Sequence, residues 1–234
     1  MRPRVSFEKT VPAAPTAASA TRRRAIALMG AGLGVALIGG CQRGDDRGAI
    51  DISGNSPALE FAMTRASDGK RVTEADYRRR IVMLYFGYTF CPDVCPTTLA
   101  NVADILKRLG PDAERVRLLF VTVDPDRDTL PVLADYVKNF APEIDGLRGD
   151  SDQIASLARR YRIAYSVTPA SGTHAYEVTH GSAIYVFDAT GAARLLIPSL
   201  GSTTDDIDGV TADLRRLVED ANPPGLFARL MRFI

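Results

Sequence analysis

Two cysteines, Cys91 and Cys95, are separated by three residues and lie between a strand-like and a helix-like segment. Residues 81–86 are continuously apolar and rich in β-branched and aromatic side chains, which predicts a strand buried on both faces of a sheet. Pro96 and the apolar residues that follow it at helical spacing predict the first turn of a helix. Free N–H groups and the dipole at a helix N-terminus favour a thiolate, so we expect a lowered pKa for Cys95.

The rest of the pattern predicts one α/β domain over residues 57–222. Parallel strands joined by crossover helices and a later antiparallel pair indicate a thioredoxin-like fold, with a mixed central sheet, flanking helices and an N-terminal β-hairpin. The predicted elements are hairpin strands 59–64 and 71–77, a strand over 116–123, a helix over 130–140, a helix over 154–161 capped by Ser151-Asp152, strands over 183–187 and 193–197, and a helix over 207–218.

The first forty residues are typical of an export signal. Three arginines, Arg22 to Arg24, precede an uncharged stretch that ends in small residues directly before Cys41. This pattern predicts a lipoprotein signal over residues 1–40, cleaved before a lipidated Cys41, and the arginine pair also resembles a twin-arginine signal. An uncleaved signal anchor is the alternative. Both place the domain on the extracytoplasmic, periplasmic side of a bacterial cytoplasmic membrane.

Polar, Gly-rich residues 41–56 are typical of a flexible tether, and residues 223–234 form a short basic and apolar tail. The tail either lies on the membrane surface or is docked or frayed. Without residues 1–40 the chain carries 23 basic and 27 acidic side chains, so its net charge is negative. A nucleic-acid partner would need a basic face, and we expect none. One compact domain on a tether gives no reason to expect more than a monomer.

The domain holds two thiols and no odd cysteine, which in an oxidising compartment form a disulfide unless they are kept reduced or metallated. A loop this short stabilises little as a structural disulfide, so a functional pair is expected. The chain has two histidines, of which His180 directly precedes a predicted strand and His174 lies in a loop. By analogy with thioredoxin-like folds, His180 faces the dithiol. Two thiolates and one imidazole suit copper, whereas zinc would need a fourth ligand such as Asp93.

Three segments, 86–96, 123–129 and 178–180, carry a family resemblance. The motifs Phe-Gly-Tyr-Thr-Phe-Cys-Pro-Asp-Val-Cys-Pro, Val-Asp-Pro-Asp-Arg-Asp-Thr and Val-Thr-His, in this order, are similar to those of the Sco/SenC family over about residues 57–220. Those proteins are membrane-anchored, thioredoxin-fold copper proteins that help to assemble the copper centre of cytochrome c oxidase. The resemblance implies that Cys91, Cys95 and His180 bind copper, as Cu(I) or Cu(II), for a copper-accepting oxidase subunit. Thr179 stands where many members have Asp.

The acidic residues Asp124, Asp126 and Asp128 allow a magnesium or calcium hypothesis, because carboxylates are hard ligands. The stronger interpretation is structural, with Asp128 or Thr129 capping the helix that follows. Arg127 is expected to pair with one of the acids, and Tyr88, beside the cysteines, is expected to pack.

Three functions compete for the cysteine pair. The first is a copper metallochaperone that uses Cys91, Cys95 and His180. The second is a thiol-disulfide oxidoreductase that keeps the oxidase's copper-binding cysteines reduced, for which His180 is dispensable. Its weakness is the spacing, because redox thioredoxins have two residues between their cysteines. A single-cysteine peroxidase is disfavoured, because the domain has no separate resolving cysteine.

Overall fold

The structure is a computed structural model that describes residues 49–173 and 175–221. The chain divides into residues 1–45 and 46–234, and only the second unit is described below. The predicted export signal with Cys41, the first part of the predicted tether, His174 and the C-terminal tail lie outside the described residues.

The centre of the fold is strand β4 (Ile81–Gly87), in which every residue is buried. It pairs in parallel with β5 (Val116–Thr122), and helix α1 (Val94–Leu109) connects the two strands. Parallel neighbours need a crossover of this kind, and the apolar face of α1, including Leu99 and Val102, is buried against the sheet. The predicted strand–helix–strand unit is therefore confirmed.

The main sheet is mixed and has the order β1-β10-β9-β4-β5-β6-β2-β3. β5 and β6 are parallel, and the remaining neighbours on both sides pair antiparallel. The strands that complete this sheet are β1 (Ile50–Asp51), β2 (Ala62–Arg65), β3 (Arg71–Thr73), β6 (Ile144–Arg148), β9 (Ile184–Phe187) and β10 (Ala193–Ile197). The two predicted hairpins are present, as β2–β3 and β9–β10. Residues 50–51, within the segment predicted as a tether, pair with β10.

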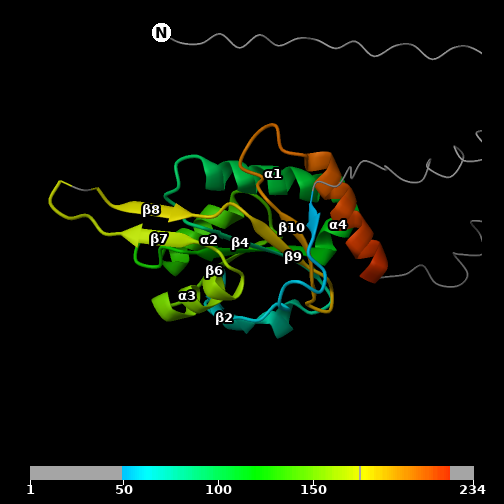
Figure 1. The fold of residues 1–234 in the computed structure, drawn as a ribbon, viewed down its shortest axis with the longest axis horizontal. Coiled ribbons are helices and arrows are strands. Elements are labelled where there is room, and N and C mark those ends of the chain that lie inside the picture. Colours follow the sequence, from blue (N-terminus) through cyan, green and yellow to red (C-terminus); the bar gives the residue numbers. More distant parts are fainter. Residues whose placement is uncertain (1–48, 174, 222–234) are drawn as a thin grey trace, which may run out of the picture. The chain divides into compact units, whose positions relative to one another are not determined.

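Helices cover both faces of this sheet. Figure 1 shows α1 and α4 (Ile207–Ala221) together on one side and α3 (Ser151–Arg160) on the other. Helix α2 (Leu130–Lys138) packs on β6, where Gly146 leaves room for the side chain of Leu133. Short 3-10 helices, η1 (Glu74–Tyr77) and η2 (Gly110–Arg115), precede β4 and β5. This arrangement is the predicted thioredoxin-like plan.

Besides β1, two regions of strand were not predicted. β6 extends the parallel part of the sheet. A separate two-stranded sheet, formed by β7 (Tyr165–Thr168) and β8 (Glu177–His180), carries His180 on its last residue rather than in a loop. Both regions are short, and β7 alternates between half-buried and exposed residues, so their apolar pattern is weak.

The predicted cap of α3 is wrong by one residue. Asp150, not Ser151-Asp152, is the N-cap. Its side chain accepts a hydrogen bond from the N–H of Gln153, and Oε1 of Gln153 accepts one from the N–H of Asp150. Within residues 49–173 and 175–221, no helix combines the length and the apolar character needed to cross a membrane.

Candidate metal centre

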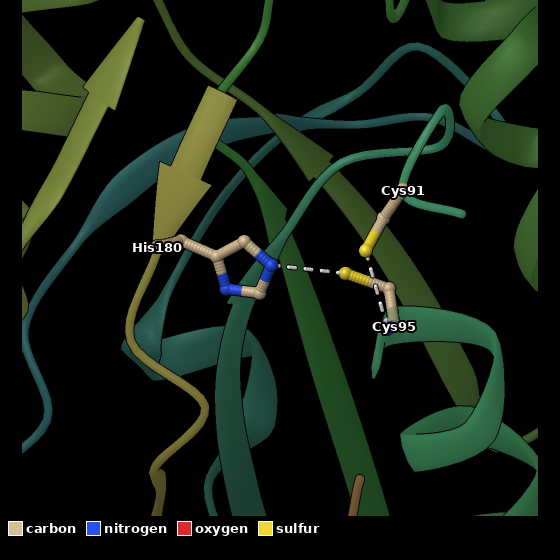
Figure 2. A group of neighbouring side chains, drawn as sticks. All are labelled: Cys91, Cys95 and His180. Atoms are coloured by element: carbon tan, nitrogen blue, oxygen red, sulfur yellow. Dashed lines mark hydrogen bonds between the residues drawn. The ribbon is translucent and has the colours of Figure 1, made fainter. Parts of the chain in front are cut away.

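Three side chains converge beyond the carboxyl end of β4. Cys91 lies in the loop after β4, Cys95 in the first turn of α1, and His180 at the end of β8 (Figure 2). Their sulfur and nitrogen atoms all lie within 4.8 Å of one another, and Nε2 of His180 is 3.2 Å from Sγ of Cys95. The structure thus brings together the three residues that the sequence singled out, from segments 85 positions apart.

The loop that carries Cys91 is held by a buried carboxylate. Asp128 accepts hydrogen bonds from the backbone N–H of Thr89 (3.0 Å), from the Thr89 hydroxyl (2.6 Å) and from the Thr122 hydroxyl (2.6 Å). The prediction that Asp128 or Thr129 caps α2 is correct in position, because Thr129 is the N-cap residue, although its side chain makes no capping hydrogen bond. Asp128 is buried and does not cap the helix. Asp128 anchors the cysteine loop to the end of β5.

The imidazole of His180 is oriented by the backbone of the next residue, Gly181. Its Nδ1 lies 3.0 Å from the carbonyl oxygen of Gly181, which accepts a hydrogen bond when Nδ1 carries the proton. That tautomer leaves the lone pair of Nε2 directed at the sulfurs. The Thr179 hydroxyl instead lies 2.8 Å from the hydroxyl of Ser166. The partner of Nδ1 is thus a backbone carbonyl and not the side chain of residue 179.

Aromatic rings pack around the imidazole. The centres of the Tyr88 and Tyr85 rings lie 5.7 and 6.0 Å from the centre of the His180 ring, both edge-on. The Tyr88 hydroxyl donates to the carbonyl of Val178 (3.4 Å), two residues before the histidine. Tyr88 therefore packs, as predicted, and ties the cysteine loop to β8.

Burial changes the ionisation of the site. It raises the pKa of Cys95 to about 12, although hydrogen bonds from the Tyr88 backbone and the Tyr85 hydroxyl act in the opposite direction. The predicted lowering of this pKa is wrong, because the thiol is fully buried and desolvation outweighs the helix N-terminus. Burial also lowers the pKa of His180, which favours the neutral imidazole that metals bind.

The acidic motif forms a different structure. Asp124 is fully buried, and its carboxylate accepts hydrogen bonds from Nε of Arg127 (2.5 Å) and from the Tyr176 hydroxyl (2.7 Å). The carboxylate of Asp128 likewise accepts hydrogen bonds from Thr89 and Thr122. In the part of the chain that the structure describes, the only cluster with metal-ligand geometry is the Cys-Cys-His one, which does not favour the magnesium or calcium hypothesis. Asp93 is exposed and is not part of that cluster.

The cluster opens into a groove of about 460 Å³. Cys91 and His180 line it together with Tyr88, Val94 and Val178. Cys91 is partly exposed, whereas Cys95 is fully buried, and both sulfurs are free thiols. Two soft sulfurs and one nitrogen can bind one soft ion, and the two sulfurs can also exchange electrons as a dithiol.

Several residues that shape the site gave no sequence signal. The hydroxyl of Tyr85 contacts the sulfur of Cys95. Gly87 leaves room for this sulfur and for the Phe120 ring, because a Cβ at position 87 would lie 2.9 Å from Sγ and 2.6 Å from the ring. Tyr176 reaches Asp124 across 52 positions. These contacts depend on the tertiary fold, and no local motif encodes them.

Comparison with known proteins places these features in a family. The family profile described as SCO1/SenC matches residues 53–219. The bovine mitochondrial SCO2 homologue is 35% identical over 202 residues, which cover 84% of this chain and 74% of the bovine protein. The mouse SCO2 homologue is 39% identical over 125 residues, 53% of this chain and 49% of the mouse protein.

A solved structure agrees with the fold and the sequence likeness. The crystal structure of Arabidopsis thaliana ScoI with copper bound is 32% identical in sequence and aligns with a TM-score of 0.61. The alignment covers 70% of this chain and 98% of the plant protein.

Proposed function

Because this chain belongs to the SCO1/SenC family, we propose that it binds copper through Cys91, Cys95 and His180 and delivers it to cytochrome c oxidase. The observation that carries the proposal is the convergence of two sulfurs and one imidazole nitrogen within 4.8 Å. The proposed recipient is a copper-accepting subunit of the oxidase, whose copper centre the protein helps to assemble. The copper bound to the similar plant protein supports the choice of metal.

The donor set suits this cargo. Thiolates are soft ligands that favour Cu(I), and imidazole helps to retain Cu(II). His180 meets the metal as a neutral base, whereas the buried thiol of Cys95 loses its proton on binding. Cys91, on the open side of the groove, is the ligand that an incoming thiolate of the acceptor replaces first.

The test is copper binding by the full chain, reduced and free of oxygen. The wild type should hold one copper per chain, and Cys91→Ser, Cys95→Ser and His180→Ala should each lose it. The other cysteine and the other histidine provide matched controls, since Cys41→Ser and His174→Ala change the same residue types. Retention of copper by His180→Ala, or loss in both controls, would contradict the proposed ligand set.

A second candidate function is thiol-disulfide exchange. The observation in its favour is that the two cysteines differ in exposure: Cys91 is partly exposed and Cys95 is buried. Thiol-disulfide exchange needs one accessible thiol that attacks and a second thiol that resolves the mixed disulfide. In this role the protein would reduce a disulfide formed by the oxidase's copper-binding cysteines. Reductase activity that survives in His180→Ala but not in Cys91→Ser would favour this function.

The proposal extends to the location of the protein. Residues 1–40 are an export signal, Cys41 carries a lipid, and the segment after it tethers the domain (57–222) to the outer side of the cytoplasmic membrane. Mass spectrometry of the mature N-terminus tests this, since a lipidated Cys41 gives a defined mass increase. A wild-type chain that keeps residues 1–40 and shows no lipid mass on Cys41 would favour the uncleaved signal anchor.

A further inference from the structure

The hydroxyl of Tyr85 lies directly behind one of the two sulfurs. Its oxygen is 3.6 Å from Sγ of Cys95 and 3.5 Å from Oγ1 of Thr98, and both contacts are oriented as hydrogen bonds donated by the tyrosine. Tyr85, Cys95 and Thr98 are each fully buried. A tyrosine hydroxyl has a single proton, so the sulfur and the Thr98 oxygen compete for it.

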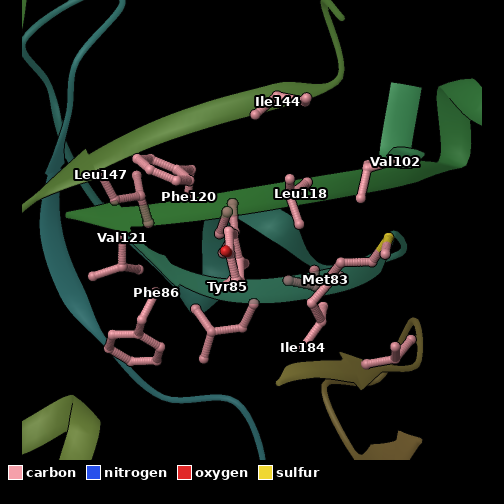
Figure 3. Close-up of a cluster of buried hydrophobic side chains, with 14 of the residues drawn as sticks. Met83, Tyr85, Phe86, Val102, Leu118, Phe120, Val121, Ile144, Leu147 and Ile184 are labelled. Atoms are coloured by element: carbon pink, nitrogen blue, oxygen red, sulfur yellow. The ribbon is translucent and has the colours of Figure 1, made fainter. Parts of the chain in front are cut away.

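The surroundings keep water away from this hydroxyl. Figure 3 shows Tyr85 among the buried apolar side chains of the central strands, with Phe120 close by. The centres of the Tyr85 and Phe120 rings are 5.9 Å apart. In such a low-dielectric environment a hydrogen bond to sulfur is stronger than the same bond in water.

We propose that the Tyr85 hydroxyl donates a hydrogen bond to the Cys95 sulfur and thereby tunes its electron donation, in the dithiol and in the copper-bound site. The copper part of the inference rests on the proposed function, and the dithiol part does not. A hydrogen-bond donor next to the sulfur stabilises electron density on the sulfur. Such hydrogen bonds are among the factors that set the reduction potential of copper–thiolate sites. Tyr85 is therefore a positioning residue.

The hydrogen bond from Tyr85 should affect both the oxidation of the dithiol and the oxidation state of bound copper. Oxidation of the dithiol removes two protons and two electrons and joins the sulfurs, and a disulfide sulfur accepts a hydrogen bond less well than the sulfur of the Cys95 thiol. The bond from Tyr85 therefore favours the reduced pair. In the copper site it makes Cys95 a poorer donor and so favours Cu(I) over Cu(II).

The deciding variant is Tyr85→Phe in the full chain, which removes one oxygen and keeps the ring. Its dithiol should be oxidised more readily in a buffer of dithiothreitol and its cyclic disulfide, which takes up the two electrons and two protons. The equilibrium constant should move by about threefold to tenfold, the range for one hydrogen bond. With Cu(II) bound, the sulfur-to-copper charge-transfer band should move to lower energy, and the copper midpoint potential should fall.

Tyr136 provides the matched control. Its ring lies 5.7 Å from that of Phe120, and its buried hydroxyl has no hydrogen-bond partner among the described residues. Tyr136→Phe therefore deletes the same atom from the same part of the core without touching the sulfur, and it should change none of the three measurements. Thr98→Val removes the competing acceptor, so it should move all three in the direction opposite to Tyr85→Phe.

The outcomes separate this inference from the proposed function. An unchanged dithiol equilibrium in Tyr85→Phe, or an equal change in Tyr136→Phe, would overturn the role of Tyr85 whether or not the protein binds copper. A wild-type chain that takes up no copper, together with a shifted dithiol equilibrium in Tyr85→Phe, would refute copper binding and uphold the hydrogen bond.

Discussion

The guanidinium of Arg127 lies over the ring of Tyr176, directly before β8, with its Cζ atom 4.0 Å from the ring centre. The same atom is 4.8 Å from the centre of the Phe90 ring, directly before Cys91, and Arg127 also pairs with the buried carboxylate of Asp124. One side chain therefore joins the segment that leads to His180 with the loop that carries Cys91. We regard Arg127 as a clamp between the two.

Loss of the clamp should lower both the copper affinity and the stability of the fold. Arg127→Met keeps an apolar side chain but removes the contact of the guanidinium with the aromatic rings and its positive charge. The carboxylate of Asp124 then keeps only the hydrogen bond from the Tyr176 hydroxyl. We expect unfolding to be easier by about 1–2 kcal/mol and copper affinity to fall by about tenfold, since the ligands are less well preorganised. Arg127→Lys should restore the charge but not the planar stacking, and so recover only part.

The control for Arg127 is a second arginine with the same arrangement. Arg216 also pairs with a nearly buried carboxylate three residues earlier, that of Asp213 on α4. Arg216→Met should lower the stability without altering copper affinity. Equal losses of copper affinity in both variants would refute a specific clamp.

Gly87 should tolerate no side chain. A Cβ at this position would lie 2.6 Å from the Phe120 ring and 2.9 Å from Sγ of Cys95. Gly87→Ala is therefore expected to destabilise the fold by about 1–3 kcal/mol and to displace the Cys95 sulfur. Gly181→Ala is the matched control next to His180, because its Cβ would meet no atom closer than 3.9 Å. Chemical unfolding and copper titration of the two variants check this.

The buried carboxylate of Asp128 should give a distinctive pH dependence. Burial raises its pKa above the ordinary 3.8, despite the hydrogen bonds from Thr122 and Thr89. The folded state then holds this proton more tightly than the unfolded chain, so its contribution to stability is complete below pH 3.8 and is lost as the pH rises through the folded-state pKa. The cost of Asp128→Asn should thus shrink over that window, as urea unfolding at several pH values would measure.

Thr122→Val gives the opposite sign and serves as the internal check on Asp128. It removes a donor that stabilises the charged carboxylate, so its cost should grow as Asp128 ionises. At neutral pH we expect about 1–3 kcal/mol, the penalty for an unsatisfied buried group. A cost that shrinks with rising pH in both variants would mean that another group titrates.

These contacts mark the limit of what the sequence predicts. The continuous apolar run at 81–86 and the helical spacing after Pro96 were enough to predict β4, α1 and the place of the cysteines between them. The strand pattern over 183–187 and 193–197 likewise predicted the β9–β10 hairpin. In each case the signal is local and periodic, and the fold follows it.

Other features depend on contacts between distant segments. The β7–β8 hairpin is short and half exposed, so its residues carry no clear period. A helix N-terminus favours a lowered thiol pKa, but the burial that raises the pKa of Cys95 comes from segments that the local sequence does not reveal. The residues around Asp128 suggest a helix cap. Its carboxylate instead accepts hydrogen bonds from Thr89, 39 positions away, which the local sequence does not reveal.

The difference in exposure between Cys91 and Cys95 predicts a difference in reactivity that can be measured without metal. Cys95 is fully buried and its pKa is raised to about 12, whereas Cys91 is partly exposed in the groove. Because only an accessible thiolate reacts, iodoacetamide at pH 8 should modify Cys91 at least tenfold faster than Cys95. Peptide mass spectrometry of Cys91→Ser and Cys95→Ser, each with one of the two thiols, measures the two rates. Similar rates in the folded variants would mean that the first turn of α1 opens readily, and the buried sulfur would then be as available for exchange as the exposed one.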